Sequence, residues 1–136
     1  MKRLLALPLI LALLFSPAAF GAVRDFGKFS VNVPKGWQVD HEGSRVTLTK
    51  GRMIMEILCE SMGRKSFDDV AQEIARQYGS DDLEGIEDYY TFTYIEDGVE
   101  SFGRVSEVKG RMYLLVLMTP HDNETMFDIE ESIRVK

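Results

Sequence analysis

The sequence is short of the residues from which disulfides and metal sites are made. It contains one cysteine, Cys59, so no disulfide can close within the chain and stability must come from packing. Its two histidines, His41 and His121, are 80 positions apart and fall in predicted loops. Zinc sites use several ligands at short, fixed spacings, so these histidines do not predict one.

Positive charge is scarce as well. The chain has 16 basic residues against 22 acidic ones, which gives a formal charge of −6. Phosphate backbones and anionic lipids attract positive charge. The composition therefore argues against nucleic acid as a partner and against binding to an anionic membrane surface.

Long apolar runs are missing except at the N-terminus. Two basic residues precede an apolar run over 4–15 and a segment of mostly small residues over 16–22. This order predicts a secretory signal peptide over residues 1–22. The apolar run is shorter than the roughly 20 residues that a membrane-spanning helix needs.

Cleavage is expected near Gly21 or Ala22. Cleavage after Gly21 fits better, because Ala19 and Gly21 then occupy the two small-residue positions. No cysteine follows the apolar run, so a lipid anchor is not expected. We expect a mature domain over 23–136 that is soluble and periplasmic, with 14 basic residues left against 22 acidic ones and a charge of −8.

Alternation of apolar and polar residues predicts strands through most of the mature chain. Asp97-Gly98 is a strong hairpin signal between two of them. The run 112–118 is apolar at every position except Tyr113, which predicts a central strand covered on both faces. The predicted strands are 29–33, 37–39, 45–49, 53–60, 89–95, 102–108 and 112–118.

Two segments have helical spacing instead. Apolar residues recur at steps of three and four over 67–78, between a predicted N-cap at Ser66 and a stop at Gly79. A last helix, which contains Met126, Ile129 and Ile133, is capped by Asp122 or Asn123. Strands joined by tight turns, with two main helices, predict one α+β domain with an antiparallel sheet.

Candidates for catalysis are few. Cys59 with His41 or His121 is the sole cysteine–histidine combination, and a small hydrolase is the least favoured alternative function. Cys59 falls among apolar residues of a strand, where a thiol is usually part of the core. No nucleophile elbow or glycine-rich phosphate loop is present, and Gly103 and Gly110 are interpreted as single turn residues.

The sequence gives equally weak support to candidate metal-binding residues. The acidic segment Asp81–Asp88 has several carboxylates for calcium but lacks the spacing of an EF-hand loop, so calcium binding is kept as an alternative function. Met53 and Met55 share a strand face and would suit copper, but core packing explains them more simply. We therefore assign no catalytic, cofactor-binding or metal-binding residue from the sequence.

Aromatic residues are dense for a domain of this size. Each ring either fills the core or lines a groove for a peptide, glycan or small molecule. The core is the simpler interpretation for any single ring. The residues concerned are Trp37, Tyr89, Tyr90, Phe92, Tyr94 and Tyr113.

The segment Phe29-Ser-Val-Asn-Val-Pro-Lys-Gly-Trp37-Gln-Val resembles the opening of the PsbP/DcrB-like superfamily. The resemblance extends over 26–136 in the order of elements. It implies an α/β/α sandwich with a central antiparallel sheet, and a binding or accessory role without catalysis. We therefore expect an exported binding module whose partner is an unknown protein or small ligand. The small-GTPase partner of a eukaryotic relative does not transfer to an exported chain.

Overall fold

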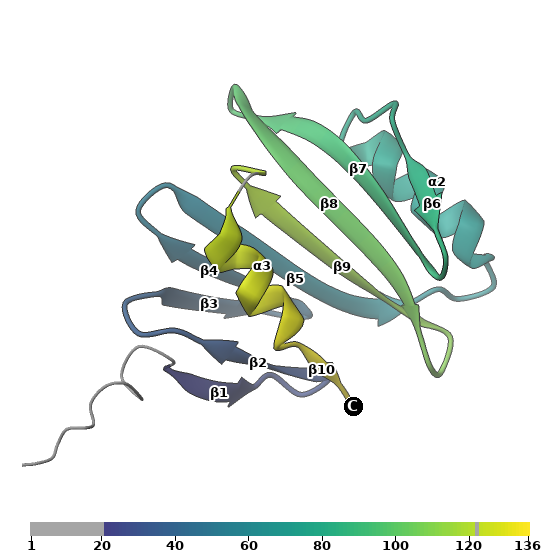
Figure 1. Cartoon of the computed structure of the whole chain (residues 1–136). Helices are drawn as coiled ribbons and strands as arrows, with labels where there is room; N and C mark the ends of the chain where they lie inside the picture. Colours follow the sequence, from purple (N-terminus) through teal and green to yellow (C-terminus); the bar gives the residue numbers. More distant parts are fainter. Residues whose placement is uncertain (1–20, 122) are drawn as a thin grey trace, which may run out of the picture.

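The computed structural model describes residues 21–121 and 123–136, and 52% of these are in strands against 17% in helices. Seven strands form an antiparallel sheet in the order β3-β4-β5-β9-β8-β7-β6, and three form a second sheet in the order β1-β2-β10 (Figure 1). The predicted signal peptide lies outside the described residues, apart from Gly21 and Ala22. The strands are β1 Ala22–Asp25, β2 Phe29–Val33, β3 Gln38–Glu42, β4 Arg45–Lys50, β5 Met53–Ser61, β6 Glu84–Ile86, β7 Tyr89–Glu96, β8 Val99–Val108, β9 Met112–Thr119 and β10 Arg134–Val135.

The large sheet joins two meanders along one seam. β3, β4 and β5 form the first meander, and β6 to β9 form the second. β5 and β9 pair along their lengths, from Ile54 opposite Thr119 to Ser61 opposite Met112. β9 therefore lies in the middle of the sheet, as its sequence predicts.

Helix α2 (Phe67–Gln77) confirms the prediction for this segment. The Ser66 hydroxyl accepts a hydrogen bond from the Asp69 amide at 3.1 Å, which caps the first turn. Helix α3 (Glu124–Glu131) is capped by Asn123, whose side chain accepts from the Met126 amide. Asp122, the other predicted cap, lies outside the described residues. Neither helix is long and apolar enough to cross a membrane, among the residues described.

The large sheet has a core on each face. Alternate residues of β9 point to opposite sides, so Val116 and Met118 join one core while Leu115 and Leu117 join the other. The first core lies under the second sheet and α3, and the second lies under α2. The prediction that this strand is covered on both faces is confirmed.

The predicted fold class, α+β with an α/β/α sandwich, is wrong. One face of the large sheet is covered by a three-stranded sheet together with α3, and the protein is more β-rich than such a sandwich. The strand 29–33 is real, but it pairs with β1 and β10 and does not continue into the following meander. The turn at Pro34–Gly36 moves the chain from one sheet to the other.

Two further segments differ from their predicted structure. Glu84–Ile86, which belongs to the acidic segment and is not among the predicted strands, forms β6 at the edge of the large sheet. Gly103, interpreted as a turn residue, lies inside β8 opposite Phe92. A side chain at position 103 would occupy the space of the Phe92 ring, which explains why glycine stands inside a strand here.

Candidate binding surface

The cysteine and histidines that a hydrolase would use do not form a site. Cys59 is 1% exposed, and burial raises the pKa of its thiol. His41 lies on β3 with its ring against Phe26, whereas His121 follows β9 and lies 3.5 Å from a Glu100 carboxylate oxygen. Strand spacings place the two histidines roughly 20 Å apart and His41 about 12 Å from Cys59.

The acidic segment Asp81–Asp88 is not assembled as a metal site. Asp82 accepts hydrogen bonds from the Thr93 amide and hydroxyl and from the Ser80 hydroxyl. The bond from the Thr93 hydroxyl is the largest contribution that lowers the pKa of Asp82. This carboxylate therefore fastens the loop to β7. Within the ranges that the structure describes, no three His, Cys, Asp or Glu side chains gather where a metal ion could bind.

The methionine pair is explained by packing. Met55 is fully buried in the core beneath the second sheet. The Met53 sulfur accepts a hydrogen bond from the Asn123 side-chain amide at 2.9 Å. Met53 therefore packs against the start of α3, as a core residue would.

The aromatic residues divide between the two faces of the large sheet. Tyr90, Phe92 and Tyr94 alternate along β7 and pack beneath α2, so most of the predicted aromatic set is core. Tyr89 points to the other face, where α3 contacts β8 at Phe102 and Arg104 but no described element packs over β6 and β7 (Figure 1). We call this part of the sheet the open face. Its residues, set by the pairing register, are Glu84, Ile86, Tyr89, Thr91, Thr93, Ile95, Glu100, Phe102, Arg104 and Ser106.

Arg104 lies at the centre of the open face between two rings. Its guanidinium carbon is 5.0 Å from the Tyr89 ring centroid and 5.8 Å from that of Phe102. Its Nη1 lies 3.3 Å from a carboxylate oxygen of Glu130 on α3. The side chain is 32% exposed, and its buried Nε has no hydrogen-bond partner among the described residues. Arg104 is thus held in place by its neighbours but keeps donors unused.

Glu130 is the buried half of this ion pair. Its side chain is 9% exposed, and burial raises the pKa of its carboxyl. The nearby Arg104 lowers that pKa, and Glu131 raises it, by smaller amounts. Phe127, one turn earlier on α3, packs edge-on against Phe102. The helix therefore positions both Arg104 and one of its two flanking rings.

Replacing Glu130 with glutamine is expected to change how stability depends on pH. A carboxyl whose pKa is raised by folding stabilises the folded state below its unfolded value of 4.5, and this contribution is lost as the pH rises through the raised folded value. The stability of Glu130→Gln relative to the natural protein should therefore increase with pH over that window. Urea unfolding from about pH 4 to pH 8 measures it. Glu107→Gln, an exposed position on β8, is the control, and equal pH profiles for the two variants would contradict the prediction.

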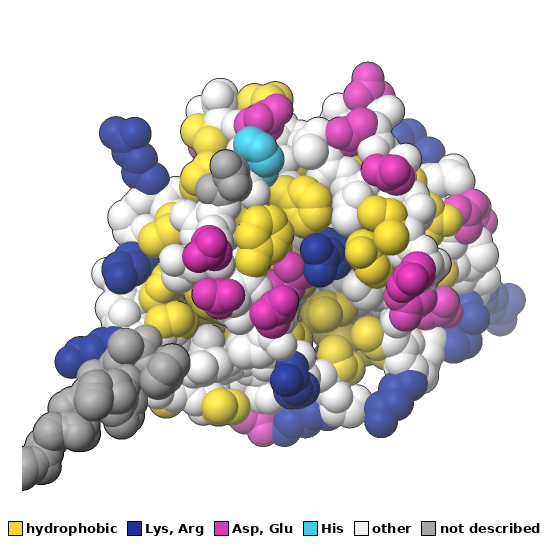
Figure 2. All heavy atoms as spheres, viewed as in Figure 1, with side chains coloured by type: hydrophobic (Ala, Val, Ile, Leu, Met, Phe, Trp, Pro, Cys, Tyr) yellow, Lys and Arg dark blue, Asp and Glu magenta, His cyan; other side chains and the backbone are white. Residues whose placement is uncertain are grey.

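The margin of the open face combines apolar and acidic side chains. Ile95 is 65% exposed and Ile86 is 38% exposed, although both are large and apolar. Glu84 and Glu100 are exposed on the same face. Figure 2 shows apolar side chains around a hollow in this side of the molecule, with both acidic and basic side chains about them. The open face thus combines large apolar side chains with Arg104 and, at its margin, the two glutamates.

Sequence reasoning identified one part of this surface and missed the rest. Tyr89 was in the aromatic set, but Arg104 and Glu130 come from β8 and α3, 26 positions apart. The alternation of Phe102, Arg104 and Ser106 against buried Val105 is the signal that places Arg104 on the less buried side of its strand. Its neighbours depend on the tertiary fold.

Comparisons with known proteins do not place the chain in a family. No protein-family model matches it, and no curated protein matches it either.

Proposed function

We propose that the protein is an exported, soluble binding or accessory module of the bacterial envelope, which docks a partner protein on the open face without catalysing a reaction. The predicted signal peptide supports export, and the absence of a cysteine after its apolar run favours release into the periplasm. The resemblance of 29–39 to PsbP/DcrB-like proteins favours the same class of function and stays a prediction.

The observation that carries this proposal is Arg104, fixed between Tyr89 and Phe102 beside α3, at the margin of a sheet face that no described element covers over β6 and β7. Arginine and aromatic residues are enriched at the centres of protein interfaces. Because the rings and Glu130 already hold the guanidinium, binding costs little side-chain entropy. A partner would gain hydrogen bonds to an arginine that is oriented in advance.

The opposite face of the sheet supplies a comparison. There β3, β4 and β5 extend beyond α2, and their outward residues include Asp40, Thr47 and Thr49. Arg45 and Glu56 form an ion pair between them. That surface is polar, as expected of a sheet face in water. The open face instead retains Tyr89 and Phe102 partly exposed, which favours a binding role for this side.

The charge of the surface indicates the chemistry of the partner. Apart from Arg104, the charged residues of the open face are Glu84 and Glu100, and the predicted mature chain carries −8. Complementary charge favours correct docking and speeds encounter. We therefore infer a partner protein that presents apolar side chains flanked by lysine or arginine, with an acceptor group for Arg104.

A photo-crosslinking residue at Thr91 tests the proposal. Thr91 is half-buried and lies opposite Arg104 on the neighbouring strand, whereas Thr47 is half-buried on the polar face and is the matched control. Irradiation of the native envelope should give one protein adduct from position 91 and none from position 47. Arg104→Ala in the position-91 protein should reduce the adduct at least tenfold, as loss of an interface hot spot does.

Two further measurements make the outcome decisive. Circular dichroism must show that Arg104→Ala is folded, and Arg104→Lys supplies a second variant that keeps the charge but loses the planar group. The captured protein, once purified, should bind more weakly as salt rises. Equal adducts at both positions, or an adduct that Arg104→Ala leaves unchanged, would overturn the proposal.

A further inference from the structure

The open face has the width of one helix. β6, β7 and β8 are neighbours in the large sheet, so the two spacings between them add up to about 10 Å. An α-helix with its side chains is about 10–12 Å across. A single helix laid over β7 therefore covers the width of these three strands.

Helix α3 shows the direction in which such a helix would lie. Phe127 contacts Phe102, and Glu130, three residues further along α3, contacts Arg104, two residues further along β8. α3 therefore runs along β8, and its buried side chains share a core with those of β9 (Figure 1). The axes of packed helices are 8–10 Å apart, which is about two strand spacings. A helix beside α3 would therefore lie over β7.

The reverse face of the same strands already carries a helix. α2 packs there with its 11 residues over a core that includes Phe92, Tyr94 and Val105 of β7 and β8. The twist of this part of the sheet therefore accommodates a helix. On the open face, no element among the described residues fills the equivalent place over β6 and β7.

The apolar residues along β7 indicate the length of the occupant. Ile95 and Tyr89 are six residues apart on the same face of this strand, a distance of about 20 Å. Since a helix rises 1.5 Å per residue, about 13 residues are needed to span that distance. This is three to four turns, the ordinary length of a helix in a globular protein.

Charged residues of opposite sign lie on the two flanks of this path. Arg104 on β8 and Glu84 on β6 are both opposite Thr91, so they lie level with each other on either side of β7. Glu100 is opposite Ile95 at one end. A helix over β7 would therefore meet a positive group on the side next to α3 and a negative group on the outer side.

We propose that the partner binds the open face through one amphipathic helix of about 13 residues, which lies over β7 and runs beside α3. It specifies the partner of the proposed docking function, on which it depends. Apolar residues of this helix pack on Tyr89, Phe102 and Ile95. A carboxylate on one flank accepts hydrogen bonds from Arg104, and a lysine or arginine on the other flank faces Glu84. Amphipathic helices bind apolar grooves in this way, through residues spaced three and four apart.

Two crosslinking positions on β7 test whether the bound segment is a helix. Thr91 and Ile95 are four residues apart on the same face, about 13 Å. Photo-crosslinking residues at these positions should attach to one segment of one envelope protein, at sites about nine residues apart, because a helix rises 1.5 Å per residue. A partner that lies there as an extended strand would give sites about four residues apart. Mass spectrometry of the two adducts identifies the sites.

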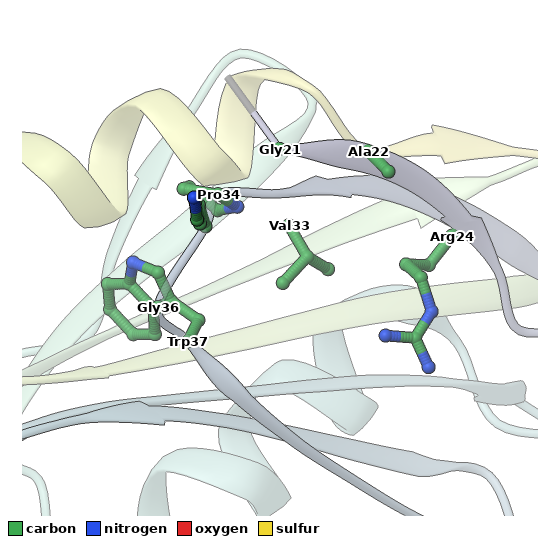
Figure 3. A pocket seen from close by; sticks show the side chains of 8 residues that line it. Gly21, Ala22, Arg24, Val33, Pro34, Gly36 and Trp37 are labelled. Carbon is green, nitrogen blue, oxygen red and sulfur yellow. The ribbon is translucent and has the colours of Figure 1, made fainter. Parts of the chain in front are cut away.

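A pocket elsewhere in the molecule supplies a control position. It has a volume of about 420 Å³ and lies between β1 and the turn that follows β2, away from β6 and β7 (Figure 3). Figure 3 shows Val33 between Trp37 and Arg24 in this pocket. Lys35 also lines it and is exposed. A photo-crosslinking residue at position 35 should not capture the same protein, because a hollow in the surface is not sufficient for docking.

A synthetic peptide of the captured segment tests the charges on the two flanks. The peptide should gain helix on binding, measured as the difference in circular dichroism between the mixture and its components. Arg104→Ala should weaken binding about tenfold or more. Glu84→Gln should weaken it about two- to fivefold, as expected of an ion pair at a surface. Glu96→Gln, an exposed position on the other face of β7, is the matched control and should leave binding unchanged.

Four results would overturn the helix: attachment sites about four residues apart, attachment sites in separate segments, a bound peptide that gains no helix, or equal effects of Glu84→Gln and Glu96→Gln. Each of them leaves the docking function standing, because the open face has still captured a protein. No adduct from positions 91 and 95, or the same adduct from position 35, would overturn the docking function and the helix together. The two failures are therefore distinguishable.

Discussion

Replacing Trp37 with alanine is expected to lower the free energy of unfolding by about 3–5 kcal/mol. Trp37 is 8% exposed and belongs to the same core as Phe29, Val33 and Val46. Truncation removes the largest side chain of that core and leaves a cavity between the two sheets, which packed neighbours fill only in part. Urea unfolding followed by circular dichroism measures the loss, since the variant keeps no tryptophan for fluorescence.

Two variants serve as controls for this result. Trp37→Phe keeps an aromatic ring at the position and should lose less stability than Trp37→Ala. Val23→Ala changes a residue of β1 that points to solvent, and should shift stability by no more than about 0.5 kcal/mol. An unfolding midpoint for Trp37→Ala close to that of the natural protein would show that the two sheets are not held together through this residue.

Most individual elements of the fold could be predicted because their side chains carry the relevant period. Residues 45–50 and 53–61 alternate between core and surface, and the sequence shows it directly. The stripe of apolar residues on α2 and the cap at Ser66 are local features as well. Local periodicity and capping require no knowledge of which segments meet.

The second sheet could not be predicted for the opposite reason. All four residues of β1 are exposed and β10 has only two residues, so neither has an alternating pattern to detect. Both strands are defined by backbone hydrogen bonds to β2. When the side chains of a strand are not buried, backbone pairing does not restrict which residue types the strand contains. Because β1 and β10 were not predicted, the layers were wrongly expected to form an α/β/α sandwich.

The open face follows from how the two cores are distributed. One core takes side chains from β4, β5 and β9, and the other takes them from β7, β8 and β9. Only β9 contributes buried residues to both. On one face, the second sheet and α3 therefore cover the half that contains β4 and β5. On the opposite face, α2 covers the half that contains β7 and β8. The sequence of one strand shows whether its faces are apolar, but not which neighbour covers them.

Replacing Gly103 with alanine is expected to destabilise the protein by roughly 2–3 kcal/mol, although alanine normally suits a strand better than glycine. Gly103 lies opposite Phe92 in the β7–β8 pair. A Cβ atom there would lie 2.3 Å from Phe92 Cζ, closer than packed atoms approach. Phe92 is itself 1% exposed, and the rings of Tyr78 and Tyr94 lie against it, so it has little room to move.

A double-mutant cycle assigns this loss to the ring. Phe92→Leu removes the atoms that meet position 103, so Gly103→Ala in that background should be close to neutral or slightly stabilising. The coupling between the two positions should therefore be about 2 kcal/mol or more. Urea unfolding of the four proteins measures it, with Trp37 fluorescence as the signal. If Gly103→Ala lowers stability equally in both backgrounds, the loss comes from backbone strain at position 103 and the Phe92 ring is not its cause. The explanation that glycine stands inside β8 to make room for the ring holds only if the loss of stability disappears when the ring is removed.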